Sequence, residues 1–121
     1  MRRLLPWLPA LVWALGVWHV GGLPSVRGVP SVPGLDKVGH FGMYGVLGFL
    51  LAFGWVRSTA GSRTVAALLL ALALGMGAAD EVRQGMMESR SQDVMDWVAD
   101  ALGAAAGFAF GAWFFRRRMD R

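Results

Sequence analysis

Four long apolar runs, separated by short charged or Pro- and Gly-rich segments, limit what this chain can fold into more than any other feature. The runs cover residues 4–20, 38–56, 64–81 and 94–115, approximately. Each is close to the roughly 20 residues that a helix needs to cross a hydrocarbon core about 30 Å thick. Because lipid offers no partner to backbone N–H and C=O groups, such runs form helices. The pattern predicts an all-α integral membrane four-helix bundle, with residues 1–121 as a single transmembrane domain.

The composition agrees with a membrane protein. Hydrophobic residues make up 55% of the chain, and the mean hydropathy is +0.47, which is too apolar for an ordinary soluble domain of this size. The absence of cysteine excludes disulfides, thiolate zinc sites and a cysteine nucleophile. The net charge of +4 comes mainly from arginines that flank apolar runs, and basic and aromatic residues do not interleave on a polar surface. We therefore expect no nucleic-acid partner.

The first apolar run lies where a cleaved signal peptide would be expected. Trp7, Trp13 and Trp18 are large for the core of a signal peptide. The last residues of the run, Trp18-His19-Val20, offer no small-residue cleavage site. We expect this run to be retained as the first span. The Pro- and Gly-rich residues 21–34 are predicted to form an irregular connection at the membrane surface.

The basic residues predict the orientation. With both termini in the cytoplasm, eight basic residues lie inside and four outside, as the positive-inside rule requires. The inner set is Arg2, Arg3, Arg57, Arg63, Arg116, Arg117, Arg118 and Arg121, and the outer set is Arg27, Lys37, Arg83 and Arg90. Every acidic residue except Asp120 then falls on the outer side. The outer face is therefore the predicted place for any chemistry.

Polar side chains share faces at the outer ends of three predicted helices. At about 100° per residue, the residues of each set fall within one arc. The sets are Asp36, Lys37, His40 and Tyr44; Asp80, Glu81 and Gln84; and Asp93, Asp96 and Asp100. In the last helix, Gly103, Gly107 and Gly111 continue the acidic stripe. Ridges of small residues bring membrane helices close together, so this stripe is predicted to face the bundle.

A carboxylate that faced lipid instead would cost about 2.5–3.5 kcal/mol. The gathered acids repel one another, and this repulsion must be relieved. Lys37, Arg83 and Arg90 are the available counter-charges, and protonation or a bound cation are the alternatives. We predict in particular that Arg90 is held by Asp93, by Asp96 or by an acid of the second helix.

At these residues the sequence resembles the VanZ-like family of bacterial membrane proteins, which is associated with teicoplanin resistance. The resemblance covers residues 36–115, approximately. It rests on three motifs, in which x is any residue: Asp36-Lys37-x-x-His40-Phe41-x-x-Tyr44, Asp80-Glu81-x-x-Gln84, and Arg90-x-x-Asp93-x-x-Asp96-x-x-x-Asp100-x-x-Gly103-x-x-x-Gly107. The chain departs from the family at Asp100, where the family usually has Asn, and at Glu88-Ser89, near which it often has Pro. The resemblance implies a role at the cell envelope, in the bacterial cytoplasmic (inner) membrane.

The first functional hypothesis is an accessory protein that binds an outer-leaflet envelope lipid, a lipid-linked cell-wall precursor or a lipoglycopeptide. Its role would be in antibiotic resistance or envelope maintenance. Arginine and lysine would contact phosphate or carboxylate, and the aspartates would order them. The predicted ligand-binding residues are Asp36, Lys37, His40, Tyr44, Asp80, Glu81, Gln84, Arg90, Asp93, Asp96 and Asp100.

Other functions are compatible with the same residues. The second hypothesis is an intramembrane enzyme that acts on a lipid-linked phosphate or sugar, with His40 as general acid or base and a divalent cation as cofactor. The candidate ligands of that cation are Asp36, His40, Asp93 and Asp96. A purely structural polar network is a third interpretation. Ion or proton transport is disfavoured, because the acidic stripe stops at Asp100 and becomes Gly and Ala.

Overall fold

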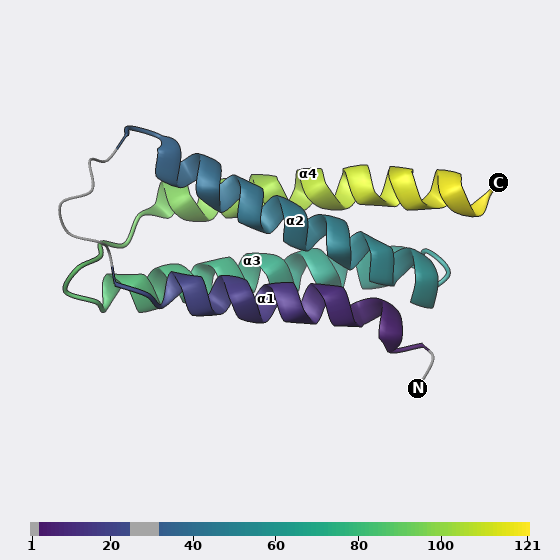
Figure 1. Cartoon of the computed structure of the whole chain (residues 1–121), viewed down its shortest axis with the longest axis horizontal. Coiled ribbons are helices and arrows are strands. Elements are labelled where there is room, and N and C mark those ends of the chain that lie inside the picture. The colour runs from purple at the N-terminus through teal and green to yellow at the C-terminus, as the bar shows by residue number, and fades with distance from the viewer. Residues whose placement is uncertain (1–2, 25–31) are drawn as a thin grey trace.

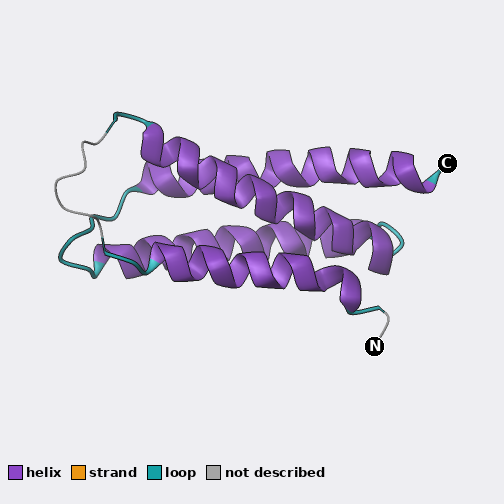
Figure 2. Cartoon of the chain, in the orientation of Figure 1, coloured by secondary structure: helices purple, strands orange, loops and turns teal. Residues whose placement is uncertain are grey.

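The computed structural model describes residues 3–24 and 32–121, and these residues contain helices and no strand. A 3-10 turn, η1 (Leu5–Trp7), leads into α1 (Leu8–Gly21). The other helices are α2 (Leu35–Ser58), α3 (Arg63–Gly85) and α4 (Val94–Met119). The four α-helices lie side by side as a bundle (Figures 1 and 2). The predicted all-α membrane bundle is confirmed.

Three of the helices, α2, α3 and α4, are long and apolar enough to cross a membrane. The fourth apolar segment, Leu5–Gly21, is shorter. At 1.5 Å per residue it would extend about 25 Å as a continuous α-helix, slightly less than a typical hydrocarbon core. It contacts both α2 and α3.

The helix ends follow from local sequence. Gly34 adopts a left-handed conformation, with φ of 82°, immediately before α2. The Ser62 hydroxyl accepts a hydrogen bond from Val65 N at 3.4 Å and caps α3. Asp93 caps α4 by accepting a hydrogen bond from Met95 N at 2.9 Å. These caps satisfy N–H groups that have no partner within their own helix.

The outside of the bundle is more apolar than its interior. Large hydrophobic side chains such as Leu15, Leu72, Leu102 and Phe110 are more than half exposed. Small residues and polar groups fill much of the inside instead, together with Tyr44, Leu47, Trp55 and a few other large side chains. This distribution is typical of a bundle whose outer surface faces lipid.

The glycine stripe of α4 packs against α2, as predicted, and these two helices make the most extensive contact of any pair. A Cβ atom on Gly103 would overlap the Phe41 carbonyl oxygen, and one on Gly107 would overlap the Gly45 carbonyl oxygen. The contact is reciprocal, because a Cβ on Gly48 would overlap the Ala104 carbonyl oxygen. Glycine therefore allows backbone-to-backbone contact along the seam, and this contact fixes how the polar ends of α2 and α4 meet.

The two ends of the bundle differ in chemistry. Both termini lie at one end together with the turn between α2 and α3 (Figure 1). Arginines at that end stack on aromatic rings: Arg57 on Phe53, Arg116 on Trp55, Arg117 on Trp113 and Arg118 on Phe114. Basic and aromatic residues together are usual at a membrane interface. The opposite end, which includes the connection between α3 and α4, carries the acidic residues other than Asp120 (Figure 1).

Candidate functional site

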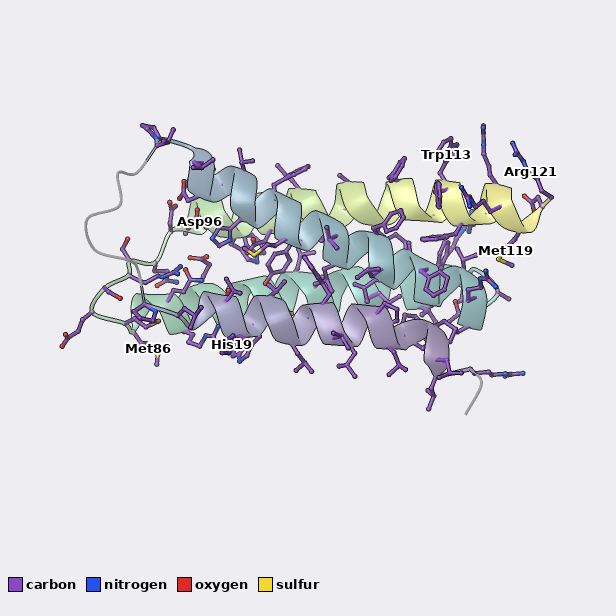
Figure 3. The ribbon with its side chains drawn as sticks, viewed as in Figure 1. His19, Met86, Asp96, Trp113, Met119 and Arg121 are labelled. Atoms are coloured by element: carbon purple, nitrogen blue, oxygen red, sulfur yellow. The ribbon has the colours of Figure 1, made fainter. Side chains whose placement is uncertain are left out.

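Buried polar side chains gather between α2, α3 and α4 near the end opposite the termini. Figure 3 places Asp96 there, far from Trp113 and Arg121. Among residues 3–24 and 32–121, six polar residues are less than 9% exposed: His40, Asp80, Glu81, Gln84, Asp96 and Asp100. Tyr44, one turn beyond His40 on α2, is 1% exposed. Three helices thus bring most of the predicted site residues into one region, which divides into three groups with different partners.

The first group joins the starts of α2 and α4 around one ammonium ion. Lys37 Nζ lies 2.7 Å from Asp93 Oδ2, 2.9 Å from Asp96 Oδ1 and 3.1 Å from Asp36 Oδ2. We call these four residues the lysine cluster. Its ammonium ion takes the central position that a cation bound by the three carboxylates would need.

The prediction that Arg90 is held by Asp93, Asp96 or an acid of α2 is wrong. Within residues 3–24 and 32–121, Arg90 makes no ion pair, and the one hydrogen bond of its side chain goes to Gln84 Oε1 at 3.4 Å. Its Nε atom is buried without a hydrogen-bond partner in the same residues. The reason is geometric: Lys37 lies in the first turn of α2, directly across from Asp93 and Asp96, whereas Arg90 reaches back toward α3. Lys37 has therefore taken the counter-charge role.

Because of the ion pairs in the lysine cluster, we expect the stability of the fold to depend on pH. The variant Asp93→Asn measures the part of this dependence that comes from the Asp93 charge. The Lys37 ammonium, and secondly the Met95 N–H, hold the pKa of Asp93 below its usual value of 3.8. A lowered pKa means that the ion pair stabilises the fold above that usual value, and that this contribution is lost as pH falls through the lowered pKa. Asparagine still caps α4 but carries no charge.

We therefore expect Asp93→Asn to melt at a lower temperature than the wild type at neutral pH. The difference should shrink as the pH falls below the usual aspartate range. Melting curves of both proteins in one detergent, recorded over a pH series, measure it. A difference that stays the same at every pH would show that Lys37 does not stabilise the fold through the Asp93 charge.

The second group lies deeper, where α2, α3 and α4 meet. His40 Nδ1 is 2.8 Å from Asp100 Oδ1, and His40 Nε2 is 3.7 Å from Asp96 Oδ2. Glu81 Oε2 accepts a hydrogen bond from Asp93 N at 3.1 Å. One donor atom from each of His40, Glu81 and Asp100 lies within 4.8 Å of the other two. We call these three residues the histidine cluster.

The third group joins α3 to α1. Arg83 Nη2 lies 2.5 Å from Asp80 Oδ1, and Gln84 Nε2 donates to Asp80 Oδ2 at 3.1 Å. The Arg83 guanidinium also donates to the Trp18 carbonyl oxygen and stacks 3.8 Å from the centre of the Trp18 ring. Gly21 leaves room for the Asp80 side chain, because a Cβ atom at position 21 would overlap the Asp80 carboxylate. Asp80, predicted to bind ligand, therefore has a structural partner, and Arg83 is the counter-charge.

The candidate metal ligands do not form one set. Asp36, Asp93 and Asp96 surround the Lys37 ammonium, whereas His40 pairs with Asp100 beside Glu81. Asp36 and His40 share a helix face, but their neighbours on α3 and α4 separate them into different clusters. Helical periodicity alone does not reveal this division, because it depends on the crossing of α2 over α4.

A cavity of about 700 Å³ opens beside these groups. Its polar lining comes from Asp36, His40, Gln84, Ser89, Arg90, Ser91 and Asp96, and its apolar lining from Val32, Pro33 and Leu35. The three apolar residues and the two serines were not among the predicted site residues. Apart from Leu35, which is the first residue of α2, they come from the connections before α2 and α4, which carry no helical pattern from which their place could be inferred.

Comparison with protein-family models identifies the VanZ/LLP1 family, whose model matches residues 7–116. The match includes all three polar groups and almost the whole chain. No curated protein and no solved structure matches this chain.

Proposed function

Because the chain belongs to the VanZ/LLP1 family of membrane proteins, we propose that it is an accessory protein of the bacterial envelope that binds the phosphate of an outer-leaflet lipid. The proposed site is the cavity lined by Arg90. One observation carries the proposal: among the described residues, Arg90 lines this cavity and has no carboxylate partner, although acids are abundant nearby. A guanidinium without a carboxylate partner can form two parallel hydrogen bonds to a phosphate.

The rest of the cavity suits an amphipathic ligand. Ser91 and Gln84 offer uncharged polar groups near Arg90, and Asp36 and Asp96 offer acceptors for sugar or amide donors. Val32, Pro33 and Leu35 supply an apolar wall. A lipid headgroup has this combination of an anion, polar substituents and an attached hydrocarbon chain. A lipid-linked cell-wall precursor and a lipoglycopeptide share this chemistry.

The proposal requires the cavity to face outward, which the positive-inside rule favours because the opposite end carries most of the arginines. We predict that Met86→Cys, beside the cavity end, reacts in intact cells with a membrane-impermeant maleimide. Ala60→Cys, in the turn at the end that holds the termini, should react only after the membrane is permeabilised. Both positions are exposed, so access to the thiol is not limiting. The reverse labelling pattern would place the cavity in the cytoplasm and overturn an outer-leaflet ligand.

The role of Arg90 is tested by titrating detergent-purified protein with polyprenyl phosphate and, separately, with phosphatidylglycerol. We expect Arg90→Gln to weaken binding by about tenfold or more, because a charge-assisted hydrogen bond contributes roughly 1.5–3 kcal/mol. Arg90→Lys should weaken it as well, since lysine keeps the charge and loses the planar fork. The two lipids distinguish a carrier-lipid phosphate from a general phospholipid headgroup.

Arg117→Gln is the matched control, because it removes the same charge at the other end of the bundle, where Arg117 stacks on Trp113. It should bind lipid like the wild type. In cells, Arg90→Lys should lose any protection against teicoplanin that the wild type provides, at equal protein level. Unchanged lipid binding by both Arg90 variants would remove the recognition role and favour a purely structural network.

A further inference from the structure

The histidine cluster contains polar atoms that hydrogen bonding leaves unsatisfied. Among the described residues, Glu81 Oε1, Asp100 Oδ2 and the Tyr44 hydroxyl are all buried without a hydrogen-bond partner. Glu81 is 3% exposed, Asp100 is 0% exposed and Tyr44 is 1% exposed. Burying such groups unpaired is costly, and native proteins usually satisfy them with an ion, a ligand or water. Three unsatisfied oxygens from three helices therefore indicate that something binds among them.

The Tyr44 hydroxyl is an observation independent of the acids. It comes from α2, one turn beyond His40, whereas Asp80 and Glu81 come from α3 and Asp100 comes from α4. Of these three acids, Asp80 is already neutralised by Arg83. Glu81 and Asp100 have no lysine or arginine side chain within 4 Å in the described part of the chain.

We propose that His40, Glu81 and Asp100 bind one divalent transition-metal cation, of the Zn²⁺ or Mn²⁺ class. The donor atoms lie within 4.8 Å of one another. Three ligands about 2.0–2.2 Å from one ion lie roughly 3.3–3.8 Å from one another, so a closing movement of at most about 1.5 Å is enough. An imidazole with two carboxylates suits zinc or manganese better than calcium, which prefers oxygen ligands alone. Two carboxylates and a neutral imidazole carry two negative charges, which such an ion would balance.

The neighbouring side chains favour a metal ion at the histidine cluster over one at the lysine cluster. Lys37 already balances part of the charge of Asp36, Asp93 and Asp96, and it fills the position between them. No lysine or arginine fills the corresponding position between His40, Glu81 and Asp100 in residues 3–24 and 32–121. His40 also lines the cavity, which gives an ion a route to the cluster. Gly77 leaves room for the site, because a Cβ there would lie 3.1 Å from Asp100 Oδ2.

The experiment uses the full chain, purified in detergent, stripped with a chelator and dialysed against Mn²⁺ or Zn²⁺ alone. Elemental analysis should find roughly one ion per folded chain, as expected for one site. Glu81→Gln and Asp100→Asn should each lower the affinity at least tenfold. Asp36→Asn, which removes one carboxylate of the lysine cluster, should retain the ion. Because no lipid is involved, the result is independent of the proposed lipid function.

A second measurement begins with the wild type, whose result does not depend on the folding of any variant. Pulsed electron paramagnetic resonance of the Mn²⁺-loaded wild type should show a hyperfine coupling to an imidazole nitrogen, and His40→Gln should lose it. Full retention of the ion by both Glu81→Gln and Asp100→Asn would overturn the site. So would the absence of a bound ion, or of a nitrogen coupling, in wild-type protein that melts cooperatively. The absence of an ion would mean that protons, instead of a metal, neutralise the two acids, and an ion without a nitrogen coupling would lie elsewhere in the protein.

Discussion

Gly107→Ala is expected to destabilise the bundle by about 1–3 kcal/mol, the usual cost of overpacking a close contact. The added methyl group would overlap the Gly45 carbonyl oxygen, which belongs to the backbone of α2 and has no rotamer by which to move away. The helices would have to separate, and separation would also pull His40 from Asp100. Gly107→Leu should be still more damaging. Unfolding in a denaturing detergent, followed by circular dichroism, measures the change.

Gly42→Ala is the matched control, because a Cβ at Gly42 has nothing within 4 Å although Gly42 lies on the same helix as Gly45. It should be neutral, or stabilise the helix by up to about 1 kcal/mol. Ala109→Leu, on an exposed face of α4, should also change little. Equal losses for Gly107→Ala and Gly42→Ala would mean that the seam between α2 and α4 does not determine the stability of the bundle.

Arg83→Met is expected to cost about 3 kcal/mol, because it leaves the buried Asp80 carboxylate without its cation. Asp80 is 3% exposed, and of the described side chains only Arg83 and Gln84 donate hydrogen bonds to it. The same substitution removes the guanidinium that stacks on Trp18, so α1 should loosen from α3. Thermal melting gives the loss, and Trp18 accessibility to a quencher reports on α1.

The double variant Arg83→Met with Asp80→Asn should recover much of the loss, because the uncompensated charge is gone. Arg57→Met is the control: Arg57 is exposed and stacks on Phe53 without a described carboxylate partner. It should cost well under 1 kcal/mol. No recovery in the double variant would show that Arg83 acts through its packing on Trp18 and not through the Asp80 charge.

Helical periodicity was sufficient to predict the features that repeat along one helix. Gly103 and Gly107 lie on the stripe of Asp96 and Asp100, and all four contact other helices as that spacing requires. The helix boundaries were less accurate. Both helices extend beyond the predicted apolar spans: α2 begins at Leu35, directly after the left-handed Gly34, and α4 continues to Met119. Arginines in the last turn of α4 favour that continuation, since cations stabilise the C-terminal end of a helix.

Periodicity did not reveal which charges pair. Lys37 and Arg90 both flank the acids in the sequence, and the choice between them depends on the crossing of α2 and α4 and on the path of the connection before α4. The stacking of Arg83 on Trp18 was not predicted either, because α1 carries no motif and its neighbour could not be inferred. Such contacts are set by tertiary packing, which a one-dimensional pattern does not contain.

The proposed function is tested most directly by native mass spectrometry of protein released from its own membrane. We predict that the wild type retains a phosphate-bearing lipid, that Arg117→Gln retains it equally, and that Arg90→Gln loses it while melting at an unchanged temperature. Equal lipid occupancy in the wild type and Arg90→Gln would contradict the assignment of the cavity beside Arg90 as a phosphate-binding site.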